Sequence, residues 1–396
     1  MKIEGLHVAS VHPILFRGGL DVIVHDTGKL FASMGVHLHY YTVEWREAEW
    51  QLPDPTYCSL SLFPGGAKLW NQQAVDFLIQ ELRLHQISVL LIPNISPFPY
   101  LDALRSSGVK LVFWNHGMPL WEYRAAIDDR RLLVKKKLSR RLEWIFLRVP
   151  FKLWTGAYRR QWEDYYRRVI EGTDLYLTLC PAYARELAER LHLPAEQASK
   201  LVPLINTLQV EPHPTLEKEK LIVFVGRLSY ADKRVDRVID IWARAHEALP
   251  DWHVEIHGTG PDEERLKAYL EQKGLPRIRF CGYTAEPSEV YRRASVLLLT
   301  STHEGWGMVL AEAQNHGVVP MAFACSSGVR AVLGEDERAG VPVRPFSLSQ
   351  YTQRLIRLCR DTDYRAKLQQ GCLSKRLEYS PERSREAWEE IFKRLS

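Results

Sequence analysis

The feature that most constrains the fold of this 396-residue chain is a set of short apolar runs separated by segments with helical period. Runs such as "LIVFV" do not alternate apolar with polar residues, so they predict strands that are buried on both faces. The amphipathic segments between the runs predict helices that cover a parallel sheet. In the second half of the chain we expect strands at 221–226, 252–258, 278–282, 295–301 and 318–324, with helices at 234–249 and 261–274.

The first half shows the same pattern less regularly, and a helix at 18–35 opens on two glycines. Its expected strands lie at 3–10, 35–43, 87–93, 109–115 and 174–179. The Pro-containing segment 203–220 lacks helical period and is the expected hinge. We therefore predict an α/β chain with Rossmann-like domains at 1–205 and 206–379. A terminal helix at 380–396 is expected to pack back on the N-terminal domain.

Composition agrees with a chain that folds as two domains of roughly 150–200 residues each. Hydrophobic residues make up 46% and charged residues 26%, and the net charge of +5 excludes a polyanion-binding protein of the strongly basic type. The six cysteines are scattered, without a Cys-x-x-Cys pair, which indicates reduced thiols rather than disulfides or a zinc site. No run resembles a signal peptide or a membrane span, so we expect a cytoplasmic protein.

The stretch "THEGWGMVLAEA" at 302–313 carries the first functional indication. Glu304 directly follows an expected strand, and Gly307 permits a tight turn before a helix that begins at Met308. The free N–H groups of such a helix end favour a phosphate. Glu312, one turn into the helix, has a carboxylate suited to the vicinal hydroxyls of a ribose. The pattern predicts a nucleotide-sugar site, and the alternative is a strand–turn–helix with two solvated glutamates.

Two cations upstream favour the nucleotide-sugar interpretation. Arg227 follows a strand and a glycine, and Lys233 comes six residues later at the start of a helix. Both are placed at the carboxyl edge of the expected sheet, where charge-assisted donors suit a diphosphate and its departure as a leaving group. The segment 257–261, "HGTGP", adds a glycine-rich turn that contains Gly258.

These motifs, in order and spacing, resemble the donor domain of family 4 retaining glycosyltransferases with the GT-B fold. The resemblance rests on "GRLSYADKR", "IHGTGP", "FCGY" and "STHEGWGMVLAEAQNHGVVPMAF", and it covers roughly residues 220–335. It extends more weakly to the N-terminal half through the Gly18–Gly19 loop. It implies two Rossmann-like domains that face each other across a cleft.

The resemblance also implies roles for individual residues of the donor domain. Glu304 would hold hydroxyls of the donor sugar, and Glu312 would bind the ribose. Arg227 and Lys233 would neutralise the diphosphate. Further donor contacts are implied for the glycine-rich turns, the backbone amides at the helix start and the loop that meets the base: Gly258, Gly307, Met308, Val309 and Tyr283.

In the N-terminal half, the resemblance implies that Gly19 lets a helix end approach the phosphates. His116, in "FWNHG", would lie across the cleft near the reacting sugar. The chain departs from the family in two places. At the hinge only Asn206 of "INTLQ" matches, and Arg330 follows Gly328 where the family often has an acidic residue.

The basic segment 121–170 carries 14 Lys/Arg against six Asp/Glu, with aromatic residues interleaved. This pattern favours contact with anionic lipid headgroups. The alternatives are a solvated helical excursion and nucleic acid, for which no recognised module surrounds the segment.

Together these observations predict a retaining, metal-independent glycosyltransferase of bacterial surface polysaccharide synthesis, cytoplasmic and peripheral on the inner face of the membrane. We expect a UDP-sugar donor and a glycan acceptor, lipid-linked, with no cofactor, no metal and no nucleic acid. A nucleotide-sugar epimerase and a non-catalytic nucleotide-sugar-binding subunit remain alternatives. A dinucleotide dehydrogenase is disfavoured because "GTGPDE" lacks the third glycine of its fingerprint.

Overall fold

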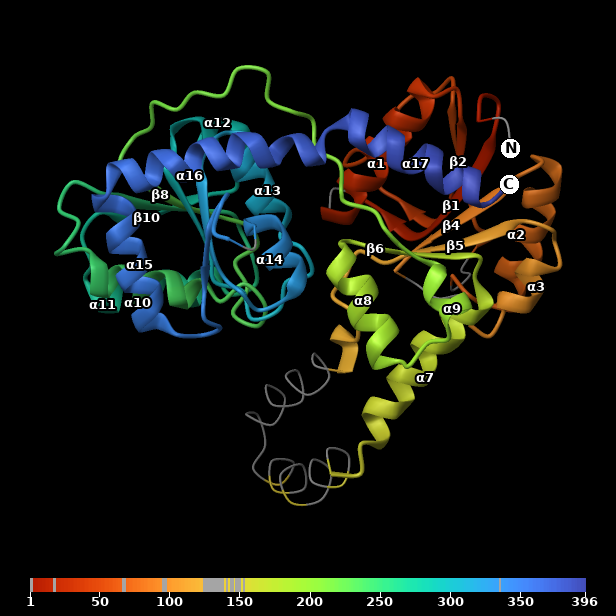
Figure 1. Ribbon diagram of the computed structural model, residues 1–396, viewed down its shortest axis with the longest axis horizontal. Coiled ribbons are helices and arrows are strands. Elements are labelled where there is room, and N and C mark those ends of the chain that lie inside the picture. The colour runs from red at the N-terminus through yellow and green to blue at the C-terminus, as the bar shows by residue number, and fades with distance from the viewer. Residues whose placement is uncertain are drawn as a thin grey trace. The chain divides into compact units, whose positions relative to one another are not determined.

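A computed structural model describes the chain except for residues 1–2, 17–18, 66–68, 95–97, 124–138, 140–141, 143–145, 147–150, 152–153 and 335. The chain forms two compact units (Figure 1). Unit 1 comprises Met1–Thr207 and Ser384–Ser396, and unit 2 comprises Leu208–Arg383. Among the described residues, no helix is both long enough and apolar enough to cross a membrane.

Unit 1 is built on a parallel sheet with the strand order β3-β2-β1-β4-β5-β6-β7. Its strands are β1 (His7–Leu15), β2 (His37–Trp45), β3 (Cys58–Leu62), β4 (Val89–Pro93), β5 (Lys110–Trp114), β6 (Leu175–Thr178) and β7 (Leu201–Pro203). Its helices are α1 (Gly19–Ser33), α2 (Gln72–Leu84), α3 (Leu101–Arg105), α7 (Ala157–Gly172), α8 (Pro181–Arg190), α9 (Ala195–Ser199) and α17 (Pro381–Arg394).

The C-terminal helix α17 packs against unit 1 through aromatic rings. The Trp388 ring meets the rings of Phe31 and Trp114 edge-on, at centroid distances of 4.9 and 5.4 Å. Because Trp388 and Phe392 are fully buried, this contact removes a large apolar area from water. The last 13 residues therefore belong to the fold of unit 1, although unit 2 separates them from it in sequence.

Unit 2 has a six-stranded parallel sheet with the order β10-β9-β8-β11-β12-β13. Its strands are β8 (Leu221–Val225), β9 (His253–His257), β10 (Ile278–Gly282), β11 (Val296–Leu299), β12 (Val319–Phe323) and β13 (Val341–Val343). Its helices are α10 (Val235–Ala245), α11 (Glu263–Lys273), α12 (Pro287–Arg293), α13 (Met308–Asn315), α14 (Ser327–Leu333), α15 (Leu348–Arg360) and α16 (Thr362–Lys375), followed by the 3-10 turn η3 (Arg376–Tyr379).

Helices lie on both sides of the unit 2 sheet (Figure 1). On one side, α10 buries Val235, Val238, Ile239 and Trp242, which follow the i, i+3, i+4, i+7 spacing of a single helical face. They pack with side chains of α15 and of the fully buried strand β8. The predicted α/β class, with two parallel sheets, is confirmed.

Two details of the strand prediction were wrong. β1 spans His7–Leu15, whereas the sequence predicted a strand at 3–10. β1 pairs with both β2 and β4 only as far as Ser10, and beyond that residue it pairs with β2 alone. Pro13, which has no N–H to donate, is tolerated in this one-sided part of the strand. The short strands β3, β7 and β13 were not predicted, because three to five residues at or near a sheet edge carry little periodic signal.

Glycines hold the loops at the carboxyl edge of the unit 2 sheet in direct backbone contact. A Cβ atom on Gly258 would lie 1.9 Å from the carbonyl oxygen of Gly226, and one on Gly260 would lie 2.4 Å from that of Leu228. The Gly258 amide also donates to the carbonyl of Gly282 at 2.7 Å. The glycine-rich turn after β9 is therefore required by packing between neighbouring loops.

We expect Gly258→Ala to lower the free energy of unfolding by about 3 kcal/mol or more, since the methyl group overlaps backbone and φ is +136°. Gly274→Ala is the matched control. That glycine also has a positive φ, +59°, but no heavy atom stands near its Cβ position, so the expected loss is about 1 kcal/mol. Urea unfolding of both variants tests the difference, and equal losses would contradict the steric explanation.

Candidate functional site

The candidate site lies where the strand order of unit 2 reverses, between β8 and β11. In doubly wound parallel sheets the loops at the carboxyl ends of these two central strands diverge and leave a crevice for ligands. Here those loops carry residues 226–234 and 300–307, which hold four of the donor-site residues predicted from the sequence: Arg227, Lys233, Glu304 and Gly307.

The structure brings Lys233 and Glu304 together. The Lys233 Nζ atom lies 2.7 Å from Oε2 of Glu304, and the side chains are only 24% and 14% exposed. The Ser301 hydroxyl donates to the same oxygen at 3.2 Å. Partial burial makes this pair stronger than an ordinary surface ion pair. It also places a cation and an oriented carboxylate side by side.

Arg227 pairs instead with Asp232, with an Nη2 to Oδ2 distance of 2.6 Å. The two side chains are 63% and 45% exposed, so this pair is weak and the guanidinium remains accessible to an anion from solvent. Asp232 was not singled out from the sequence, because an aspartate in a polar loop carries no local signal.

Backbone hydrogen bonds fasten the two loops to each other. The Thr300 hydroxyl lies 3.1 and 3.0 Å from the carbonyl oxygens of Lys233 and Arg234, and the Thr302 amide donates to the Asp232 carbonyl at 2.8 Å. Because Thr300 is fully buried, these bonds are shielded from water. They fix the separation between the Lys233 and Glu304 segments.

Arg237 completes this brace, and sequence reasoning missed it. Its guanidinium donates to the Thr300 carbonyl at 2.9 Å and lies 4.7 Å from the centre of the Phe346 ring. Burial lowers the pKa of Arg237 to about 10, with the nearby Arg234 charge adding to the effect. In the sequence this arginine lies within the amphipathic pattern of α10, where it resembles a solvated residue.

Helix α13 begins where the sequence predicted. Gly307 has φ +82°, and a Cβ atom there would lie 2.9 Å from Cδ1 of Leu310, so this turn requires glycine. Met308 and Val309 are the first residues of the helix, at the end that carries its partial positive charge.

Glu312 lies one turn further along α13, in contact with Tyr291 of α12. The Tyr291 hydroxyl, which is buried, donates to Oε2 of Glu312 at 3.0 Å. Burial raises the pKa of Glu312, while the Tyr291 hydrogen bond and the positive charge of Lys233 act against that rise. The carboxylate is thus held in one orientation, and Tyr291 is a second residue that the sequence did not indicate.

Tyr283, which follows β10, is 61% exposed. Gly258 is brought to the same edge, but its contact with Gly226 already explains why it is glycine.

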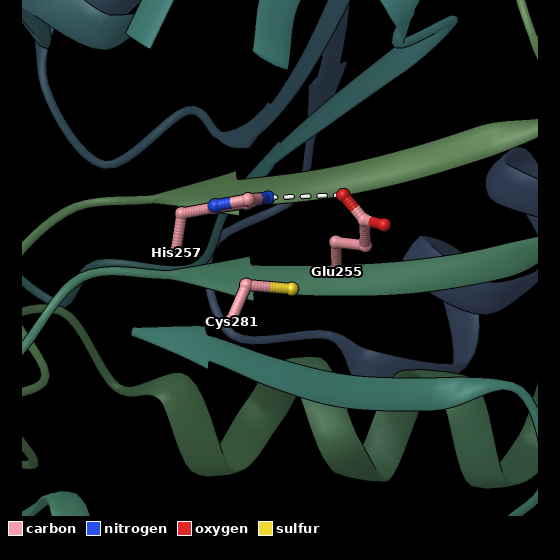
Figure 2. A group of neighbouring side chains, drawn as sticks. All are labelled: Glu255, His257 and Cys281. Atoms are coloured by element: carbon pink, nitrogen blue, oxygen red, sulfur yellow. Dashed lines mark hydrogen bonds and ion pairs between the residues drawn. The ribbon is translucent and has the colours of Figure 1, made fainter. Parts of the chain in front are cut away.

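Beside Tyr283, three side chains with metal-binding atoms gather on β9 and β10: Glu255, His257 and Cys281 (Figure 2). His257 Nε2 lies 3.0 Å from Oε2 of Glu255, and the side chains of His257 and Glu255 point toward each other in Figure 2. Their ligand atoms and the Cys281 sulfur all lie within 4.8 Å of one another.

The surroundings do not fit a cation. Arg279 and Arg293 donate to the two oxygens of Glu255 at 2.6 and 3.0 Å. Burial works to raise the pKa of Glu255, but hydrogen bonds from Arg279 and His257 and the arginine charges lower it to about 2. Burial raises the pKa of Cys281, which disfavours the thiolate that binds metal. A metal ion would have to displace two guanidinium groups.

In unit 1, Gly19 is the first residue of α1, and Gly18 lies outside the described residues. No heavy atom stands within 4 Å of a Cβ position at Gly19, so packing within the described residues gives no reason for glycine there.

His116 follows β5, and its backbone amide donates to the Asn94 side chain at 2.7 Å. Its ring packs on Trp114 at 4.3 Å, and neither ring nitrogen is exposed. Burial lowers the pKa of His116 to about 3, an effect that the nearby Asn206 side chain opposes and His12 reinforces. At neutral pH the ring is uncharged, so it is suited to hydrogen bonding rather than to proton donation.

A small polar cavity of about 20 Å³ lies near the carboxyl ends of β4 and β5. That volume holds about one water molecule. The half-buried Glu122 lines it, and the Tyr166 hydroxyl is 3.0 Å from one of the Glu122 carboxyl oxygens. Burial raises the pKa of Glu122. Other lining residues are Asn94, Asn115, Trp121 and Tyr176.

Comparison with known proteins adds independent information. Residues 206–372 match the model of the group 1 glycosyl transferases, and residues 17–203 match that of glycosyltransferase family 4. The chain is 30% identical over 175 residues to the amylovoran biosynthesis glycosyltransferase AmsD of Erwinia amylovora, covering 44% of this chain and 48% of that protein. It is 30% identical over 129 residues to the lipopolysaccharide 1,6-galactosyltransferase of Salmonella typhimurium, covering 31% and 35%.

The matched segments thus span less than half of these relatives' lengths. Solved structures cover the whole chain. The apo form of the lipopolysaccharide outer core galactosyltransferase WaaB superimposes with a TM-score of 0.67 at 17% identity, over 98% of this chain and 99% of that one. Anabaena HepE in complex with UDP gives 0.73 at 13% identity, over 98% and 99%. At these identities the likeness establishes the fold.

The two buried histidines predict acid sensitivity of unit 1. Burial lowers the pKa of both His12 and His116 to about 3, against 6.5 in the unfolded chain. Between those values the unfolded state binds protons that the folded state does not. Stability is therefore complete above pH 6.5 and falls below it, by about 1.4 kcal/mol per pH unit for each histidine. In urea unfolding followed by hydrogen exchange of β1 and β5, His12→Gln should reduce this slope, and an unchanged slope would contradict the assignment.

Proposed function

Because the chain belongs to the family 4, group 1 glycosyltransferases of GT-B fold, we propose that it transfers a sugar from a nucleoside diphosphate sugar to a glycan acceptor. The donor in this proposal is a UDP-sugar, and the acceptor is a lipid-linked glycan of bacterial surface polysaccharide synthesis. The names of the relatives support a polysaccharide or lipopolysaccharide acceptor. The HepE structure, which contains UDP, supports uracil as the base of the donor nucleotide.

The observation that carries the proposal is the Lys233–Glu304 pair beside the start of α13. It presents a cation and a helix N-terminus for a diphosphate and a carboxylate for sugar hydroxyls. In the proposed complex Lys233 and Arg227 turn to the diphosphate, and Glu304 accepts hydrogen bonds from the sugar. Glu312 receives the ribose hydroxyls on the carboxylate that Tyr291 orients.

In the proposed reaction the acceptor oxygen forms a bond to the anomeric carbon on the face from which the diphosphate leaves, so the configuration is retained. The bond between the anomeric carbon and the phosphate oxygen breaks, and the proton of the acceptor hydroxyl passes to the departing diphosphate. Arg227, Lys233 and the Met308 and Val309 amides stabilise the charge that develops there. His116 is proposed as a neutral hydrogen-bonding group for the sugar, which requires its ring to turn so that a buried nitrogen faces the ligand.

Nucleotide binding is the first test. UDP, GDP, ADP and NAD are compared by thermal unfolding, in which a ligand at 100 times its dissociation constant adds about 2.7 kcal/mol to stability. We expect UDP to raise the melting temperature of the wild type and Glu312→Ala to lose most of that rise. Glu271→Ala removes an exposed carboxylate on α11 and is the control, which should keep the full rise. If only NAD raises the melting temperature, or if none of the four nucleotides does, the proposed function is wrong.

Product analysis then separates the alternatives. Release of UDP from a UDP-sugar only after a glycan acceptor is added indicates transfer. Conversion of the donor sugar without release of UDP indicates an epimerase, and binding without either reaction indicates a non-catalytic subunit.

We also propose that the basic segment 121–170 contacts an anionic membrane surface. Three of its described aromatic side chains are strongly exposed: Trp154 is 91% exposed, Phe146 71% and Phe151 67%. Helix α7 adds Arg159, Arg160, Arg167 and Arg168. Exposed aromatic rings beside arginines suit the interface of an anionic bilayer.

Cosedimentation with vesicles tests this contact. We expect the wild type to bind vesicles that contain phosphatidylglycerol more tightly than pure phosphatidylcholine vesicles, and less tightly as salt is raised. Replacing Trp154 and Phe151 together with alanine should reduce binding several-fold. Leu84→Ala, which removes a comparably exposed apolar side chain of α2, should not (71% exposed). The contact is refuted if the wild type binds both kinds of vesicle equally, or if the double variant and Leu84→Ala bind phosphatidylglycerol vesicles equally.

A further inference from the structure

At the amino-terminal edge of the unit 1 sheet, four histidines gather. They are His7, His37, His39 and His85, called here the histidine cluster. His7 and His37 are in register on adjacent strands, and His37 and His39 alternate along β2, so these three side chains share one face of the sheet. His85 follows the last residue of α2 and joins them from that helix. All four lie at the opposite strand ends from the ligand-side loops.

The imidazole rings are in direct contact. The His7 ring stacks on His37 at 4.7 Å, and the His39 ring lies 4.9 Å from that of His85. Between these two contacts, Nδ1 of His7 lies 3.0 Å from Nε2 of His39. Two nitrogens bound to one tetrahedral zinc ion are about 3.3 Å apart, given Zn–N distances near 2.0 Å. The His7 and His39 nitrogens are therefore already close to chelating distance.

Ser59 of β3 fixes the orientation of one ring. It stands directly opposite His39 in the sheet, and its hydroxyl oxygen lies 2.8 Å from His39 Nδ1. When Nδ1 donates its proton to that hydroxyl, Nε2 carries the lone pair and faces His7. Metal-binding histidines are commonly held in this way by an outer hydrogen bond on the second ring nitrogen. Moving the His7 proton from Nδ1 to Nε2 frees the second lone pair without a change in charge.

The electrostatic surroundings favour a cation here more than in the Glu255–His257–Cys281 group. Burial, followed by the neighbouring histidines, lowers the pKa values of His7 and His39, the latter to about 4, so both rings are neutral at neutral pH. Among the described residues, no lysine or arginine contributes to either shift. Glu81 lies 3.5 Å from His85 Nε2 and supplies a negative charge on the far side of the cluster.

We propose that the histidine cluster binds one divalent transition-metal ion of the zinc type, with His7 and His39 as the first two ligands. His85, whose side chain is 39% exposed, supplies the third by rotation about its side-chain bonds. Neutral imidazoles select Zn²⁺, Ni²⁺, Co²⁺ or Cu²⁺ over Mg²⁺ and Ca²⁺. This site is separate from the proposed transferase site and does not depend on it.

Calorimetric titration of the metal-stripped full-length protein with zinc chloride tests the site. We expect one equivalent to bind with a dissociation constant below about 1 µM. His39→Asn should abolish that binding, and Ser59→Ala should weaken it roughly tenfold through loss of the outer hydrogen bond. His257→Asn and Cys281→Ser are matched controls in the other group and should bind zinc as the wild type does.

Cobalt substitution identifies the ligands. A histidine site gives a visible tetrahedral spectrum without the near-ultraviolet thiolate band, and His85→Asn, on the surface and therefore safe for folding, should change it. Should His39→Asn fail to fold, His85→Asn and Ser59→Ala decide the matter. Binding weaker than about 10 µM, or a thiolate band that disappears in Cys281→Ser, would overturn the proposal.

Discussion

Parallel pairing of every strand is the constraint on which the rest of this structure depends. A parallel sheet needs helical crossovers on both faces, so its strands are buried and all of their carboxyl ends meet at one edge. That arrangement brings Lys233 to Glu304, although the two residues lie 71 positions apart in the chain. It also brings the turns after β8 and β9 so close that only glycine fits at 258 and 260.

In the candidate site, each predicted diphosphate-binding cation forms an ion pair with a carboxylate. Lys233 pairs with Glu304 and Arg227 with Asp232, so each cation that would meet a diphosphate has a carboxylate partner nearby. Such pairing limits the cost of holding charge in a partly buried crevice. Binding of the proposed donor exchanges these contacts for phosphate and hydroxyl partners. The exposed Arg227 pair is the easier of the two to exchange.

Histidines serve different purposes at the two edges of the unit 1 sheet. The ring nitrogens of His116 and the His12 side chain are buried, burial lowers both pKa values to about 3, and both rings remain neutral in any physiological solution. The histidine cluster is half-buried, and burial followed by the neighbouring rings lowers the pKa values of His7 and His39. Protonated imidazoles in contact would repel one another. Neutral imidazoles that share the proposed metal ion would instead be held together by their bonds to it.

The sequence by itself determined the two parallel sheets, the helix that begins at Met308, and the placement of Glu304, Arg227 and Lys233 just past strand ends. These features are local, because a wholly apolar run, a glycine turn and a helix start can each be recognised within about a dozen residues. Only the tertiary structure decided that Arg237 and Thr300 brace the site, that Tyr291 orients Glu312, and that His7 meets His39. Those contacts join residues 21 to 63 positions apart, and strand order and register, which no local pattern encodes, select them.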